Sequence, residues 1–427
     1  MRRSSAIAVA TMTAAALTLT ACGRSSGTST GAETGKDVSA GKATGTITVW
    51  AMGAEGENLP TLAKDFEAAN PGAKVNVTAI PWDAAHDKFT TAITAGKTPD
   101  AAMVGTTWMG EFAGLGALDP TPKSIDSSKF FPGAQGTTKV GDTSYGIPWY
   151  VETRLVYYRT DLAKKAGFTE APKSWDELKA MAKGMQSKAG AKWGIGLQAG
   201  GTGSWQTVMP FAWSNGANLT KDGGKGYNFD TPEIKEAVDY YKSYFDEGIS
   251  DKAAPATPTT EPDFVSGKVP MFISGPWEMS AVEKLGGAGF KDKYAVAAMP
   301  VKKTSSSFVG GSDFVVFKNS KQRDTAWKFT QFLADPKTQA KWYSQSTDLP
   351  SVQSAWQDPS ISADKKLAVF GEQLKTAQAP PSFATWEQVV AQFDTQMEQV
   401  TKKDADVSAA LKSVQSQAES IGTGSGK

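Results

Sequence analysis

Histidine and cysteine are almost absent from this sequence, which holds one of each, His86 and Cys22, among 427 residues. A catalytic Ser–His or Cys–His arrangement depends on a histidine beside its nucleophile, and a single histidine in a charged helix-forming segment is a poor candidate for that role. Zinc sites need several Cys or His ligands, so any metal would have to be held by oxygen atoms. The composition argues against triad hydrolases and zinc enzymes, and we expect no catalytic residue, no metal and no cofactor.

An excess of charge of either sign is lacking as well. The 45 Lys and Arg residues nearly balance the 44 Asp and Glu residues, which gives a formal charge of +1. Removal of Arg2 and Arg3 with a leader segment would leave 43 basic and 44 acidic residues, a charge of −1. Since the basic residues form no stripe, we expect no nucleic-acid partner.

Long apolar runs are missing except near residue 1. Ala6–Leu19 follows Arg2 and Arg3, is rich in Ala, and closes on small residues directly before Cys22. This pattern is typical of a signal peptide, residues 1–21, and the run is too short for a comfortable membrane span. Cys22 has no disulfide partner in the chain, and its position resembles a bacterial lipobox. We expect lipid on Cys22 to anchor the protein to the outer face of the cytoplasmic membrane; the alternative is a soluble secreted protein.

Two segments lack the apolar residues that a folded core needs. Residues 22–45 consist almost entirely of Gly, Ser, Thr, Ala and a few charged residues, which predicts a disordered tether. Residues 422–427 have the same character and predict a disordered tail. The body between them, about 380 residues, exceeds what one hydrophobic core usually supports, so two lobes are expected.

Strand-like and helix-like segments alternate along this body. Short runs rich in β-branched and aromatic residues precede segments with apolar residues at helical spacing. Strands are predicted at 46–50, 74–80, 99–104, 155–158, 271–273 and 314–317, and helices at 59–70, 83–95, 174–188, 231–248, 324–333, 338–343 and 386–400. The alternation predicts an α/β fold in which each lobe is a mostly parallel sheet flanked by helices, with ligand groups beyond the carboxyl ends of the strands.

Several motifs, each weak alone, stand in an order that resembles a known family. They are Lys97–Asp100, Phe112–Leu118, Tyr145–Pro148, Tyr157–Leu162, Met271–Trp277, Gly310–Ser312 and Ala326–Phe329. From about residue 46 to about 415 the chain is similar to the bacterial extracellular sugar-binding proteins of ABC importers, the family that includes maltose-binding protein. The resemblance implies a two-lobed fold of the periplasmic-binding-protein type (type II), with a hinge between the lobes and no enzymatic activity.

The same resemblance implies a ligand and a partner. The ligand would be a carbohydrate, two or a few sugar units long, captured between the lobes of a monomer. The partner would be a membrane permease whose ATPase subunits are other chains. Binding would favour the closed arrangement of the lobes, because the ligand has a higher affinity for the closed state than for the open one.

Tryptophan beside a carboxylate suits a sugar, which has flat apolar faces and a rim of hydroxyl groups. The segments with Trp149 and Glu152, and with Trp277 and Glu278, provide both groups, although core packing and surface ion pairs are the alternatives. By resemblance, Glu152 matches an acid that hydrogen-bonds ligand hydroxyls at the first crossing between lobes. Trp277 and Trp386 match tryptophans that stack on the sugar.

Further contacts are expected in the first part of the chain. Glu55 lies in Met52–Glu57, which matches the family's first ligand-contacting loop. Thr107 and Trp108 stand where maltodextrin-selective relatives carry charged contacts. The predicted pocket is therefore less charged and more aromatic than in those relatives.

Three other residues are candidates from their place in the sequence. Trp82 and Trp205 lie in predicted loops at the rim of the cleft, where they either contact the ligand or pack in a core. Asp313 lies at a predicted second crossing, as a ligand acceptor or a hinge residue.

The chain is expected to cross between lobes near Tyr150–Thr153, near Val309–Asp313 and again near Leu333–Pro336. Residues 46–152 with 313–335 would then form the N-terminal lobe. Residues 153–312 with 336–421 would form the C-terminal lobe.

Two other functions stay open. An exported glycoside hydrolase would use paired acids such as Glu152 and Glu278. A surface lipoprotein could bind a solute other than a sugar, or serve as a structural protein without a small ligand.

Overall fold

The computed structural model describes residues 35–253 and 260–424. The predicted signal peptide, Cys22 and the tether as far as residue 34 lie outside this part, as do residues 425–427 of the predicted tail. Among the described helices, none combines the length and the apolar character that crossing a bilayer requires.

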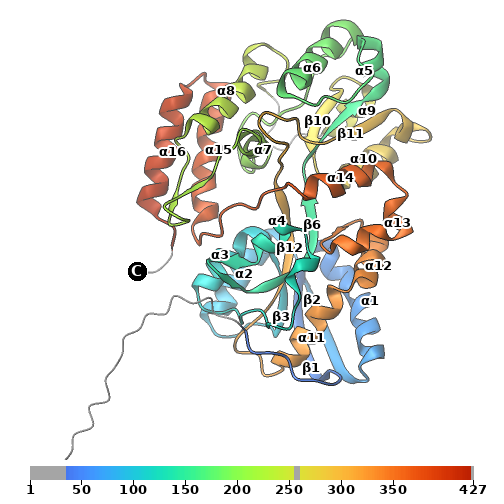
Figure 1. Cartoon of the computed structure of the whole chain (residues 1–427), viewed down its shortest axis with the longest axis vertical. Helices are drawn as coiled ribbons and strands as arrows, with labels where there is room; N and C mark the ends of the chain where they lie inside the picture. Colours follow the sequence, from blue (N-terminus) through green and yellow to red (C-terminus); the bar gives the residue numbers. More distant parts are fainter. Residues whose placement is uncertain (1–34, 254–259, 425–427) are drawn as a thin grey trace, which may run out of the picture. The chain divides into compact units, whose positions relative to one another are not determined.

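A six-stranded sheet, in the order β13-β6-β12-β3-β1-β2, is the centre of what we call the first lobe (Figure 1). Its strands are β1 (Thr44–Met52), β2 (Gly72–Ile80), β3 (Ala101–Gly105), β6 (Gly146–Thr153), β12 (Val309–Val316) and β13 (Leu349–Pro350). β1 pairs in parallel with β2 and β3, whereas β12 is antiparallel to both β3 and β6, and β13 is antiparallel to β6.

The helices of the first lobe cover this sheet. They are α1 (Gly53–Ala69), α2 (Trp82–Thr94), α3 (Met109–Gly114), α4 (Pro132–Thr137), α11 (Arg323–Leu333) and α12 (Pro336–Ser346). α1 shows why: Leu59, Leu62 and Phe66 recur at helical spacing and are all buried, so one face of the helix packs on the sheet. The ring of Phe66 meets that of Phe329 from α11 edge-on, with centroids 5.2 Å apart.

A three-stranded sheet, in the order β10-β7-β11, is the centre of the second lobe. Its strands are β7 (Leu155–Arg159), β10 (Met271–Ser274) and β11 (Tyr294–Ala297), and its helices are α5 (Thr160–Ala166), α6 (Trp175–Ala189), α7 (Trp205–Ser214), α8 (Pro232–Asp246), α9 (Thr260–Ser266), α10 (Trp277–Gly286), α15 (Trp386–Lys402) and α16 (Val407–Ile421). Both pairings with β7 are antiparallel. Small hairpins, β4 (Lys139–Val140) with β5 (Thr143–Ser144) and β8 (Thr220–Lys221) with β9 (Gly226–Tyr227), lie outside the two sheets.

The α/β class is confirmed, but the expectation of mostly parallel sheets is wrong. Within the six-stranded sheet only the β1 pairings are parallel, and the pairings within the second sheet are antiparallel. The physical reason lies in the connections. β12 enters the first sheet directly from the second lobe rather than through a crossover helix, and only crossover connections force neighbouring strands to run in parallel.

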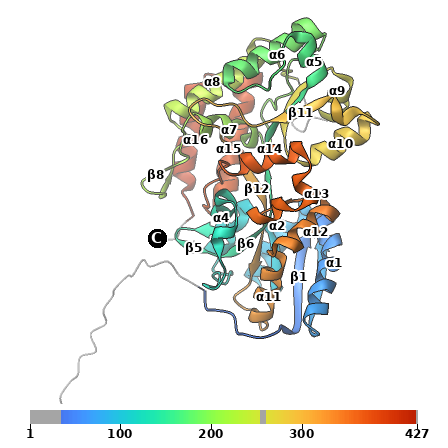
Figure 2. The ribbon, with the colours of Figure 1, turned by 45° about the vertical axis from the view of Figure 1, so that its right-hand side comes forward.

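The chain links the two sheets at several points. β6 of the first sheet ends at Thr153 and β7 of the second begins at Leu155, while β12 leads back into the first sheet. α13 (Pro359–Ser362) and α14 (Lys365–Leu374) pack in a cluster that contains Val151 from the first sheet and Tyr157 from the second. The turned view in Figure 2 shows α13 and α14 at this junction.

The third crossing lies further along the chain than the sequence suggested. α12 packs on α1, and β13 extends the six-stranded sheet, so residues 336–350 lie with the first lobe rather than the second. The chain passes to the second lobe between the end of α14 and the start of α15, where Val309 donates a backbone hydrogen bond to Gln378. Sequence periodicity identifies α12 as a helix but not the sheet on which it packs.

Residues 35–43 lie against the first lobe, although the sequence placed them in a disordered tether. The backbone N–H of Ser39 donates to Asp324 at 3.0 Å, and that of Ser124 donates to Asp37 at 3.0 Å. Ala43 is buried directly before β1. Backbone and short polar groups hold this segment together with Val38 and Ala43, which pack on the first-lobe core. Two apolar residues in a polar stretch are too few for composition to indicate this packing.

Asp313 lies in β12, where the pairing with β6 shifts register, and only 1% of its surface is exposed. The Thr137 hydroxyl lies 3.0 Å from each carboxyl oxygen of Asp313 and 2.7 Å from the carbonyl of Ala134. The hydrogen bond that Thr137 donates favours the charged carboxylate, but the burial of Asp313 outweighs it. Burial raises the pKa of Asp313 to about 8.

Asp313→Asn should flatten the pH dependence of stability. An acid whose folded-state pKa lies above its unfolded value holds a proton that unfolding releases, so wild-type stability falls as pH rises from about 4 to about 8. Melting temperatures measured across this window should therefore decline less steeply in the variant. The exposed Asp142→Asn is the matched control, and parallel curves for wild type and Asp313→Asn would contradict the assignment.

Candidate functional site

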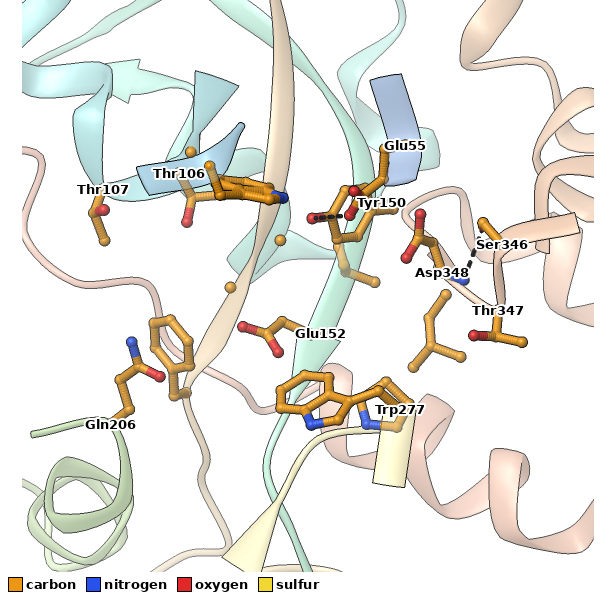
Figure 3. Close-up of a pocket in the computed structure, with 18 of the residues that line it drawn as sticks. Glu55, Thr106, Thr107, Tyr150, Glu152, Gln206, Trp277, Ser346, Thr347 and Asp348 are labelled. Atoms are coloured by element: carbon orange, nitrogen blue, oxygen red, sulfur yellow. Dashed lines mark hydrogen bonds between the residues drawn. The ribbon is translucent and has the colours of Figure 1, made fainter. Parts of the chain in front are cut away.

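A cavity of about 450 Å³ is lined by residues of both lobes, and we call it the cleft. On the first lobe, its walls begin where the parallel strands end: α1 follows β1, and the 3₁₀ helix η1 (Thr106–Trp108) follows β3. The connecting strands β6 and β12 line it next, and the starts of α7 and α10 close it from the second lobe. Side chains from elements far apart in sequence therefore face one space (Figure 3).

Aromatic side chains are held in the cleft with much of their surface exposed. Trp277, the first residue of α10, is 45% exposed, and Trp82, the first residue of α2, is 40% exposed. A side chain on Gly275 would place its Cβ 2.1 Å from the ring of Trp277, so glycine is needed for the ring to lie over the chain there. Large exposed aromatic surface in a cavity is typical of a binding site rather than of a core.

Arg154, between β6 and β7, organises the centre of the cleft without lining it. Its guanidinium donates to Glu152 and to Gln206, each at 2.5 Å. The same group lies over the ring of Trp277, 4.7 Å from the centroid, and over that of Phe308 at 5.6 Å. All four partners line the cleft, so one buried cation sets the positions of an acid, an amide and two aromatic rings.

Acceptor groups gather on the first-lobe side. The Tyr150 hydroxyl donates to Glu55 at 3.1 Å, and the indole N–H of Trp342 donates to Asp348 at 2.9 Å. Burial, with the charge of Glu55 adding to it, raises the pKa of Asp348 to about 7. Figure 3 shows Glu55, Tyr150 and Asp348 grouped together, with Glu152 between them and Trp277. Aromatic faces beside carboxyl acceptors suit a ligand with flat apolar faces and a rim of donors.

The described ranges hold no group of three or more His, Cys, Asp or Glu side chains placed to bind a metal ion.

The structure brings six of the predicted site residues together. Lining the cleft are Glu55, Trp82, Thr107, Trp108, Glu152 and Trp277. The element around Glu55 differs from the expectation, because α1 begins at Gly53 and Glu55 lies in its first turn rather than in a loop.

Other predicted contacts lie elsewhere. Trp149 is buried and stacks near Trp342, with centroids 4.7 Å apart, on the other face of β6. Trp205 and Trp386 are buried against each other at 5.2 Å in the second-lobe core. Each begins a helix, as Trp277 does, but these two helix starts meet inside the lobe, so their rings fill the core instead of the cleft.

Asp313 and Glu278 also lie outside the cleft. Asp313 is buried beside Thr137 and has no surface on the cavity. Glu278 lines a neighbouring cavity of the second lobe.

Several cleft residues were not predicted, among them Tyr150, Gln206 and Asp348. Alternation along a strand places every second side chain on one face, so the choice of Glu152 pointed to Tyr150 rather than Trp149. No sequence signal marks Gln206 or Asp348. Asp348 follows Thr347, which has a left-handed backbone conformation, and only the folded chain brings this turn to the cleft.

Comparisons with a family profile and with related proteins agree on one family. The sequence profile described as bacterial extracellular solute-binding protein matches residues 61–369. A putative binding protein of Brucella abortus is 30% identical over 375 residues, which is 86% of this chain and 90% of that protein. The diacetylchitobiose-binding protein of Streptomyces coelicolor is 29% identical, over 75% of this chain and 76% of its own length.

Solved structures share the two-lobed fold. The sugar-binding protein MalE of Xanthomonas citri superposes with a TM-score of 0.83 at 31% identity, covering 88% of this chain and 97% of that one. The GacH receptor of Streptomyces glaucescens, solved unliganded and with acarbose, gives 0.75 at 26% identity, covering 89% and 99%. The prediction of a two-lobed α/β binding-protein fold is confirmed.

Arg154→Met should destabilise the protein mainly by leaving Glu152 without its partner. The side chains of Arg154 and Glu152 are 9% and 19% exposed. We expect a loss of about 2 kcal/mol in the free energy of unfolding, below the range for fully buried pairs because Glu152 keeps some water.

A double-mutant cycle checks this prediction by urea denaturation. Arg154→Met combined with Glu152→Gln should cost less than the sum of the two single changes. Additive losses would mean that the ion pair contributes nothing beyond its separate contacts.

Proposed function

Because this chain belongs to the family of bacterial extracellular solute-binding proteins, we propose that it captures a carbohydrate of two or a few sugar units in the cleft. It then delivers this ligand to the membrane permease of an ABC importer, whose ATPase subunits are separate chains. The protein acts as a monomer and needs no cofactor.

The observation that carries this proposal is the pairing of exposed rings with acceptors in the cleft. Trp277 and Trp82 offer ring faces to the apolar sides of sugar units. Glu55, Glu152 and Asp348 supply acceptors for the hydroxyl rim. A peptide ligand would instead call for groups that pair with a backbone, such as an open sheet edge.

The names of related proteins support a carbohydrate. Relatives include a diacetylchitobiose-binding protein of Streptomyces coelicolor, a maltotriose-binding protein of Pyrococcus abyssi and a galactooligosaccharide-binding protein of Bacillus subtilis. These proteins bind different sugars, so they support the ligand class and leave the particular sugar to experiment.

Closure of the lobes couples binding to delivery. A sugar stacked on Trp277 of α10 and hydrogen-bonded to Glu55 of α1 touches both lobes and therefore favours the closed state. The crossings at β6, β12 and residues 375–385 are where the chain would bend.

A glycoside hydrolase is disfavoured by the placement of the acids. Glu152 lines the cleft and is paired with Arg154, whereas Glu278 faces a different cavity. The Glu152 carboxylate is therefore held by Arg154 rather than free to attack a glycosidic bond or to activate a water molecule.

A thermal-shift screen against mono- and oligosaccharides tests the proposal. A ligand that binds only the folded state must raise the melting temperature. We expect a rise with at least one di- or trisaccharide, recovered unchanged after incubation. Recovery of cleaved sugar would establish a hydrolase instead, and a broad panel without any shift would refute carbohydrate binding.

Trp277→Ala should weaken sugar binding about 10- to 100-fold, because covering an aromatic side chain contributes about 1.5–3 kcal/mol. Isothermal titration calorimetry with the sugar found in the screen measures the change. Trp193→Ala is the matched control, since Trp193 is partly exposed and does not line the cleft. Equal sugar affinities of wild type and Trp277→Ala would show that Trp277 does not take part in binding.

We also propose that lipid on Cys22 anchors the protein outside the cytoplasmic membrane. Each buried methylene group contributes about 0.8 kcal/mol to membrane binding. Cys22→Ala should therefore move the protein from the membrane fraction to the medium in a bacterial host. Continued membrane retention of Cys22→Ala after washing with high salt would show that another contact holds it.

A further inference from the structure

A second cavity adjoins the cleft on the second lobe, and we call it the side chamber. Its volume is about 400 Å³, and its walls come from residues 196–207, the end of β10 and the start of α10. Gln206 and Trp277 line both cavities. Each cavity falls within the range of about 300–1,000 Å³ that small-molecule sites have. Two ligand-sized spaces therefore share Gln206 and Trp277 as wall residues.

Glu278 gives the side chamber a polar atom that lacks a partner. The residue is 7% exposed, and its Oε1 accepts a hydrogen bond from the Ser274 hydroxyl at 3.1 Å. Its Oε2 is buried and has no hydrogen-bond partner in the described part of the chain. Such an atom is costly to bury without a partner, and buried carboxyl oxygens are rarely left unpaired. The side chamber has room for that partner.

The cation nearest to the chamber is already committed. Arg154 lines the chamber, but its two terminal nitrogens donate to Glu152 and Gln206. Burial raises the pKa of Glu278, and the charge of Glu261 raises it further. The Trp277 indole lies near enough to the carboxyl group to lower its pKa, but it makes no hydrogen bond to Oε2 in the described part of the chain, and a ligand in the chamber can supply one.

We propose that the side chamber is a second subsite, in which Glu278 accepts a hydrogen bond from the sugar unit next to the one that stacks on Trp277. This inference rests on the proposed carbohydrate function. The donor is an O–H or N–H group on a pyranose ring. A ligand that occupies both spaces has at least two rings, so Glu278 makes the protein select disaccharides over monosaccharides.

Calorimetric titration of Glu278→Gln tests this subsite, because the substitution places an amide N–H or a single acceptor where the carboxylate stood. The probes are maltose, chitobiose and N,N′-diacetylchitobiose, each beside its monosaccharide. We expect the variant to bind the preferred disaccharide about tenfold more weakly than wild type, and the monosaccharide equally well. Preference for chitobiose over its diacetylated form would identify the donor as an amine, the reverse order would identify an acetamido N–H, and equal affinities would identify a hydroxyl.

Glu283→Gln is the matched control. Glu283 lies on the same helix, accepts a hydrogen bond from Tyr294 at 2.7 Å and lines neither cavity. Its disaccharide affinity should equal that of wild type, and melting temperatures of both variants show whether they fold.

The outcomes separate this inference from the proposed function. If wild type binds disaccharides and Glu278→Gln binds them as tightly, or loses mono- and disaccharide affinity alike, the subsite is refuted and carbohydrate capture stands. Wild type that prefers the monosaccharide also refutes the subsite. If wild type binds none of the sugars, both proposals fail together.

Discussion

The contacts of the Arg154 guanidinium hold the cleft together. The residue sits where the chain leaves the first sheet for the second, between β6 and β7, so its position is fixed by both lobes. From there it reaches Glu152 on β6, Gln206 on α7 and the ring of Trp277 on α10. A planar cation is suited to this task because it can donate in its plane and stack on a ring with its face, which a lysine could not do. The ion pair also leaves Glu152 with lone pairs free for a ligand.

The positions of the other cleft residues are set by the ends of strands and the starts of helices. Parallel strands β1 and β3 end at the cleft, which delivers Glu55 and the segment Thr106–Trp108 to it. Trp82 and Trp277, each at the start of a helix, provide the exposed ring faces. Gly275 leaves room for the ring of Trp277. A site built in this way has rigid walls, while the crossings between the lobes allow those walls to approach each other.

Sequence reasoning identified much of this arrangement for physical reasons that are local. Glu152 and Trp277 were predicted because a tryptophan beside a carboxylate is recognisable in a short segment, and because the family resemblance gave both residues a place in the cleft. The wrong predictions concern residues whose burial depends on how distant segments pack together, which no short segment of sequence shows. Trp205, Trp277 and Trp386 all begin helices, yet Trp277 is 45% exposed and the other two are at most 3% exposed, because burial depends on which helix starts meet in space. Asp348 lies in a turn that no sequence motif marks. The periodicity of α12 predicts a helix, but it does not reveal that this helix packs in the first lobe.

The most direct test of the account is a crystal structure of the protein with the sugar that raises its melting temperature most. We expect one sugar ring packed on the indole face of Trp277, within hydrogen-bonding reach of Glu152, and contacts between the sugar and both lobes. A sugar bound outside the cleft, for example in the cavity beside Trp356, would contradict it. So would a sugar in the cleft that leaves Trp277 uncovered, since the exposed ring would then have no part in recognition.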